Sequence, residues 1–92
     1  MDCPFQIGDV VQLLVDNPDN NEFLHAGDTG TAVYIDTYKG EYFIGVDWGR
    51  DIEGHSCNAC CEYGNGWNVD CDQLTLAGAS AISLPSDFDV LL

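Results

Sequence analysis

The sequence predicts a small all-β protein, a closed or nearly closed barrel of five short strands. Short runs of β-branched and aromatic residues alternate with dense turn residues, and no helical apolar period occurs before residue 77. A chain of 92 residues makes one domain, and closing its sheet would remove edges that so small a protein would otherwise expose. We therefore expect a barrel over residues 1–76 and an acidic-apolar C-terminal tail over residues 77–92.

Turn chemistry separates the first two expected strands. Residues 10–15 are mostly apolar and β-branched, which indicates a buried strand. Residues 16–21 are rich in Asp and Asn and form a loop, and Gly27-Asp28-Thr29-Gly30 forms a second tight turn. Residues 31–36 then alternate along the chain, which predicts a strand with one buried face.

The remaining strands follow from a hairpin and a late turn. Residues 38–41 indicate a hairpin turn, with residues 42–48 as its return strand. Residues 67–69 and 74–76 are short closing strands, and the Asp70-Cys71-Asp72 sequence between them suits a single 3₁₀ turn. A long loop rich in cysteine and glycine separates the third strand from the fourth.

The charge of the chain excludes several classes of ligand. Sixteen acidic residues face two basic ones, Lys39 and Arg50, and the formal net charge is −14. Nucleic acid and anionic lipid both require basic clusters, so we expect no direct binding to either, and a charged partner should be basic. No apolar run reaches the roughly 20 residues that span a bilayer, and the N-terminus lacks the pattern of a signal peptide. We therefore expect no membrane association and a cytoplasmic location.

Four candidate metal ligands lie close together in the long loop: His55, Cys57, Cys60 and Cys61. These residues, or Cys71 in place of Cys60, would supply the nitrogen and sulfur ligands of a tetrahedral structural zinc. Two alternatives stay open, a disulfide from Cys57 to Cys60 or Cys61, and thiols that only pack. Because no third catalytic group or oxyanion hole accompanies the Cys–His pair, we expect no enzyme activity and no cofactor other than this candidate zinc.

Three segments carry a familiar pattern: Gly8-Asp9-Val10-Val11, Ala26-Gly27-Asp28-Thr29-Gly30-Thr31-Ala32-Val33 and Phe43-Ile44-Gly45-Val46-Asp47-Trp48. They resemble the SH3-like barrel of the mind bomb and KOW type. The resemblance covers about residues 7–76 and implies a five-stranded SH3-like barrel.

Residues 54–69, with Gly54-His55, Cys57, Cys61 and Gly66-Trp67, carry a second pattern. It resembles uncharacterised small proteins that are common in bacteriophages and mobile elements. This chain departs from that pattern with Asn65 where a second histidine is usual, with Asn68 where a tryptophan is usual, and with an additional Cys60. The resemblance implies a phage-like setting and, with it, the cytoplasm of a host cell.

A rigid barrel covered with carboxylates approximates the charge density of a nucleic acid backbone. In a phage-like setting this predicts a non-enzymatic protein-binding module that occupies a basic surface of a host nucleic-acid-binding or defence protein, as an anti-CRISPR or DNA-mimic inhibitor does. The alternatives are a small zinc- or thiol-stabilised structural domain and an aromatic-groove reader of basic peptides. The residues expected to contact the partner are Asp47, Trp48, Asp51, Glu53, Glu62, Tyr63 and Trp67.

Overall fold

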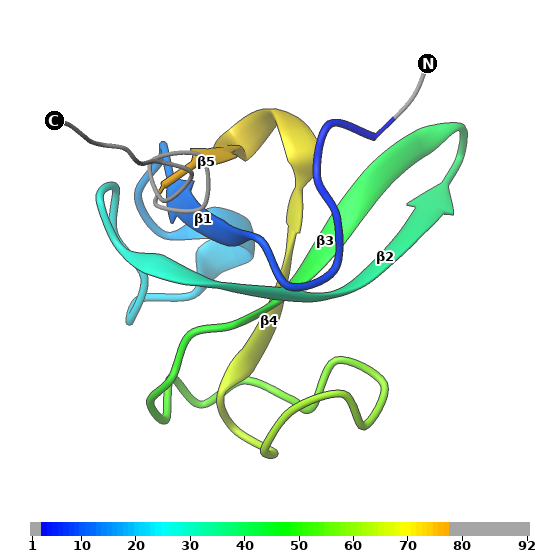
Figure 1. The fold of residues 1–92 in the computed structure, drawn as a ribbon. Helices are drawn as coiled ribbons and strands as arrows, with labels where there is room; N and C mark the ends of the chain where they lie inside the picture. Colours follow the sequence, from blue (N-terminus) through cyan, green and yellow to red (C-terminus); the bar gives the residue numbers. More distant parts are fainter. Residues whose placement is uncertain (1–2, 78–92) are drawn as a thin grey trace, which may run out of the picture.

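The structure is a computed structural model that describes residues 3–77 (Figure 1). It confirms the all-β class: five antiparallel strands form one open sheet in the order β4-β3-β2-β1-β5. The elements are β1 (Val10–Leu13), η1 (Pro18–Asn20), β2 (Thr29–Tyr38), β3 (Glu41–Asp47), β4 (Gly66–Asp70), η2 (Cys71–Gln73) and β5 (Leu74–Leu76), where η denotes a 3₁₀ turn. Over this part of the chain no helix has the length and apolar character needed to cross a membrane. The predicted tail lies outside the described residues, apart from Ala77.

The five predicted strands are confirmed, with ends that differ by one or two residues. The hairpin turn between β2 and β3 has Lys39 and Gly40 at φ 53° and 83°. Positive φ at both central residues is what a two-residue type I′ turn requires, which explains the glycine at this position. The predicted 3₁₀ turn is η2, which connects the two edge strands β4 and β5.

A β-bulge divides β2 into two halves. Ala32 pairs with Val46 and Tyr34 pairs with Gly45, so that Val33 is an extra residue without a partner in β3. Because of this extra residue, Ala32 and Ile35 both face the core, although they would point to opposite faces of a regular strand. The prediction of one continuous alternation over residues 31–36 is therefore wrong at Val33.

The core lies against one face of the sheet. Val11, Ala32, Ile44 and Val46 are fully buried there. Removing each large apolar side chain from water contributes roughly 1.5–3 kcal/mol, which makes this layer the main source of stability. The burial of β1 alternates: residues 11 and 13 are buried and residues 10 and 12 are half-buried, so one face of the predicted buried strand contributes to the core.

Two long-range hydrogen bonds hold the loops to the sheet. The Asn21 side chain is buried and donates to the carbonyl oxygen of Ile52 over 3.2 Å. The indole Nε1 of Trp67 in β4 donates to the carbonyl oxygen of Pro18 over 2.9 Å. The β1–β2 loop is thereby fixed against β4 and against the connection between β3 and β4 (Figure 1).

Candidate functional site

The β3–β4 connection, residues 48–65, packs onto the sheet through Cys57. Gly45 and Gly66 lie on the face of the sheet opposite to the core, yet both are buried. A Cβ atom on Gly45 would lie 3.0 Å from the sulfur of Cys57, and a Cβ atom on Gly66 would lie 2.6 Å from it. The two glycines therefore leave the space that this thiol fills, and Cys57 is only 2% exposed.

This packing holds the connection in a strained backbone. Cys57, Asn58 and Ala59 follow one another with φ of 49°, 60° and 65°. Left-handed backbone costs roughly 1–2 kcal/mol for a residue with a Cβ atom. The Cys57 sulfur lies 3.7 Å from the carbonyl oxygen of Val46 and 3.8 Å from Oδ1 of Asn68, and its single S–H can donate to either acceptor.

The structure brings two of the predicted zinc ligands together but not the whole set: the sulfur atoms of Cys57 and Cys61 both lie near the Cβ position of Gly66. The Nδ1 atom of His55 accepts a hydrogen bond of 3.0 Å from the backbone N–H of Cys57, and its imidazole stacks on the indole of Trp67 at 5.6 Å. Cys60 is exposed and its thiol faces the carbonyl oxygen of Asn58 at 3.7 Å. Within residues 3–77 no three His, Cys, Asp or Glu side chains converge in the manner of a metal site. The structure therefore gives no support to the predicted zinc site, and His55, Cys57 and Cys60 each make other contacts.

The thiols themselves sit in environments that keep them protonated. Burial raises the pKa of Cys57 to about 12, and the adjacent Cys61 thiol adds to the rise. Burial also raises the pKa of Cys61, and the charge of Asp47 acts in the same direction. A thiolate is the form that attacks an electrophile or binds a metal, so the environment of Cys57 suits packing rather than reaction.

The predicted partner-contact residues divide into buried and exposed groups. Trp48 is a core residue, 4% exposed, which leaves little of its side chain for contact with a partner. Tyr63 is 80% exposed. Trp67 and Glu53 border a shallow hollow of about 310 Å³, together with Phe23. Asp51, Glu53 and Glu62 are exposed, and Asp47 is half-buried.

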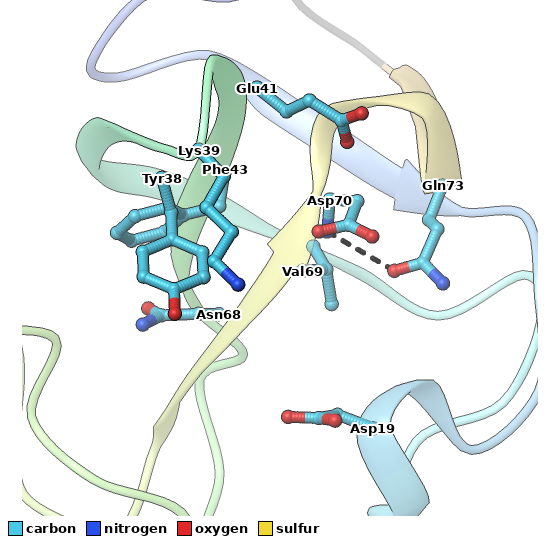
Figure 2. A pocket seen from close by; sticks show the side chains of 9 residues that line it. All are labelled: Asp19, Tyr38, Lys39, Glu41, Phe43, Asn68, Val69, Asp70 and Gln73. Carbon is cyan, nitrogen blue, oxygen red and sulfur yellow. Dashed lines mark hydrogen bonds between the residues drawn. The ribbon is translucent and has the colours of Figure 1, made fainter.

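A larger hollow lies beside the β2–β3 hairpin and has a volume of about 520 Å³ (Figure 2). We call it the hairpin groove, and it lies between the hairpin turn, β4, η1 and η2. Its lining includes the half-buried Phe43 of β3. The residues that line it are Asp19, Tyr38, Lys39, Glu41, Phe43, Asn68, Val69, Asp70 and Gln73.

The hairpin groove combines aromatic surface with carboxylates. Tyr38 is 67% exposed, and the ammonium nitrogen of Lys39 lies 5.4 Å from the centre of its ring. Figure 2 shows the Lys39 side chain within the groove, with Glu41 and Asp70 among the surrounding residues. A cation at this distance from an aromatic face is attracted by the quadrupole of the ring.

Few of the acidic residues have a basic neighbour. Within residues 3–77 the one ion pair joins Arg50 to Asp28 at 3.1 Å. Partial burial acts to raise the pKa of Asp28, but a hydrogen bond from the His25 N–H and the Arg50 guanidinium lower it overall. The Thr37 N–H and the Tyr34 hydroxyl donate to Asp36 and lower its pKa. These contacts stabilise individual carboxylates, while the field of the whole chain remains strongly negative.

Comparison with known protein families, curated proteins and solved structures gives no match for this chain. The evidence for a site therefore comes from the geometry of the chain. Sequence reasoning missed Phe43, Asn68 and Asp70 as members of one groove. One feature of the sequence could have indicated the groove. Tyr38-Lys39-Gly40-Glu41 places an aromatic ring, a cation and a carboxylate in one hairpin turn.

Proposed function

We propose that this protein is a non-enzymatic binding module whose partner is a basic protein surface. The observation that supports it best is the net charge of −14 combined with a single internal ion pair over residues 3–77. Carboxylates without counter-ions repel one another and disfavour the compact state. A basic partner relieves that repulsion on binding, and the negative field speeds its approach.

The proposed partner is a nucleic-acid-binding or defence protein of a host cell. Such proteins carry basic grooves that accept a phosphate backbone, and an acidic protein can occupy the same groove. An encoding phage or mobile element, acting in the host cytoplasm through an anti-CRISPR or DNA-mimic type of inhibition, is part of this proposal.

An SH3-like barrel is the fold that we propose for this module. The support is topological: the edge strands β4 and β5 are consecutive in the chain and are joined only by the short turn η2. Because a short turn can connect only strands whose ends lie close together, the sheet must curl until its two edges approach each other. Such a sheet is nearly a closed barrel, and closure protects the edge strands.

Capture from host lysate tests the proposed function. The immobilised protein is incubated with lysate at low and at moderate salt, with and without duplex DNA as a competitor. We expect it to retain one or a few basic proteins that salt and DNA both release, because the acids and the DNA would occupy one groove. Retention of a partner that is insensitive to both would contradict the electrostatic mechanism.

A pair of matched variants shows whether the predicted contact acids take part. Glu53→Lys with Glu62→Lys reverses two exposed carboxylates of the β3–β4 connection. Asp36→Lys with Asp72→Lys makes the same change of net charge at exposed positions outside the connection and the hollow beside it. Stronger loss of the partner with the first pair would place the contact on the connection, whereas equal loss would show that only the total charge matters.

A second candidate function is a thiol-stabilised structural domain with no inhibitory role. The burial of Cys57 against Gly45 and Gly66 favours it, because this arrangement serves packing alone. Under this alternative, the lysate experiment returns no protein that duplex DNA displaces.

A further inference from the structure

The hairpin groove already holds a cation of the chain itself. Lys39 is one of only two basic residues in the sequence, and its ammonium group lies over the ring of Tyr38. Within residues 3–77 this ammonium forms no ion pair with any carboxylate. The groove therefore attracts a positive charge through its aromatic face and its overall field, without a fixed salt bridge.

We propose that the hairpin groove is the subsite that takes a lysine or arginine side chain from a basic segment of the partner, and that Lys39 occupies this subsite in the protein alone. The inference rests on the proposed function, because it requires a basic partner. It adds the place of contact and the chemistry of the group that enters.

The lining of the groove suits a long cationic side chain better than an apolar or an anionic one. The rings of Tyr38 and Phe43 offer surface to the methylene stem, and Asp19, Glu41 and Asp70 offer carboxylates to the charged head. An anion would face three carboxylates, and an apolar group would leave them without a counter-ion. A volume of about 520 Å³ admits a side chain together with part of its backbone.

Lys39 can leave the groove without disturbing the fold. It is exposed and lies at the tip of the hairpin, and its side chain makes no hydrogen bond within residues 3–77. Rotation about its side-chain bonds is enough to release the ammonium group into solvent. A cation from the partner then replaces it over Tyr38, and the negative field favours that replacement.

Binding of a hexalysine peptide at low ionic strength tests the subsite, with a hexaglutamate peptide as the control probe. Dissociation constants come from a fluorescent label on the peptide, and amide NMR shifts locate the contact. Tyr38→Ala should weaken hexalysine binding by about two- to five-fold, the scale of an exposed cation–π contact. Ile7→Ala removes an exposed apolar side chain outside the groove and should leave binding unchanged.

Two charge-matched variants test the role of Lys39. Lys39→Gln and Arg50→Gln each remove one positive charge, but only Lys39 lines the groove. Lys39→Gln should tighten hexalysine binding at least two-fold more than Arg50→Gln, because it also removes the resident competitor. Equal effects of the two variants, or weaker binding with Lys39→Gln, would overturn the assignment of Lys39.

The outcomes separate this inference from the proposed function. If hexalysine changes amide NMR shifts only in residues 51–63 and Tyr38→Ala does not weaken its binding, the groove is not the subsite. The proposal of a basic partner would still stand. No binding of hexalysine at low ionic strength would also overturn the groove as the subsite, and the lysate experiment would then judge the proposed function independently. Shifts at Tyr38, Phe43 and Asn68, together with weaker binding of Tyr38→Ala, would establish the subsite.

Discussion

The β3–β4 connection and the hairpin groove lie at opposite ends of β3 and use their residues in opposite ways. The connection carries most of the reactive residue types in the chain, yet Cys57 fills space above two glycines and His55 accepts a backbone hydrogen bond. The hairpin groove has ordinary residues, but it leaves Tyr38 and several carboxylates open to solvent. Residue types that are often catalytic or metal-binding can thus serve packing, as Cys57 does here. The exposed hairpin groove, by contrast, is formed by residues that belong to no sequence motif.

The largest effect that follows from this comparison concerns thiol reactivity. At pH 8, native Cys57 should react with iodoacetamide about a thousand-fold more slowly than the same residue in denaturant, because its pKa rises from 9.0 to about 12 and little thiolate forms. Exposed Cys60 is the internal control and should be modified first. Mass spectrometry of digested protein measures both rates. Similar rates at the two cysteines in the native protein would mean that the connection opens readily.

The packing between Cys57 and its two glycines should give the next largest effect. Gly66→Ala should lower the free energy of unfolding by about 1–3 kcal/mol, because its Cβ atom would overlap the Cys57 sulfur and the His55 carbonyl oxygen. Part of the loss should be recovered in a Cys57→Ala background, with a coupling of at least about 0.5 kcal/mol. Gly49→Ala is the control for backbone strain, since its φ of 76° disfavours alanine although nothing lies near its Cβ position. Urea denaturation measures the four variants, and additive losses would contradict direct packing.

Alkaline pH should weaken the same contact. The pKa of Cys57 is raised in the folded protein, so the folded state keeps a proton that the unfolded chain loses above about pH 9. This contribution to stability is fully present below pH 9 and is lost as the pH rises towards 12. Burial raises the pKa values of Cys61 and Cys71 and adds in the same direction. Urea denaturation at pH 7.5 and pH 10 should show a smaller difference for Cys57→Ala than for the parent protein, whereas equal differences would exclude Cys57 as a cause.

The smallest effect should come from the hairpin groove. Tyr38→Ala and Glu41→Gln should each change the free energy of unfolding by no more than about 0.5 kcal/mol, because both side chains are exposed and neither belongs to the core. Thermal and urea denaturation of these two variants and of Gly66→Ala compare the three losses of unfolding free energy directly. A loss above 1 kcal/mol in either groove variant would show that the groove is part of the structural framework and not an open surface.

The sequence was sufficient for the strands because turn chemistry is local. Residues 16–21 and 38–41 fix where β1 and β2 end, and their turn residues act through backbone angles alone. The bulge at Val33 was not predictable, since an extra residue changes which face a side chain takes without changing polarity along the chain. Closure of the sheet into a barrel and the phage-like setting remain predictions.

The site was harder to predict than the strands because it depends on distant residues. His55 and the cysteines have residue types that suit zinc, and only the position of Gly45 and Gly66 reveals that Cys57 is committed to packing. The hairpin groove joins Asp19, from the β1–β2 loop, to Gln73, from η2. No periodicity or spacing connects positions so far apart, and only the folded arrangement of strands brings them to one surface.

The bulge in β2 makes one position of this strand dispensable. With Val33 present, Ile35 faces the core and Asp36 faces solvent. Because Val33 has no partner in β3, deleting it would place Ala32 and Ile35 two positions apart, and both would still face the core in a regularly paired strand. Deleting a paired residue of β2 would instead exchange the two faces of the strand beyond the deletion. During divergence of such sequences, a one-residue gap in an alignment should therefore fall at Val33 and not elsewhere in this strand.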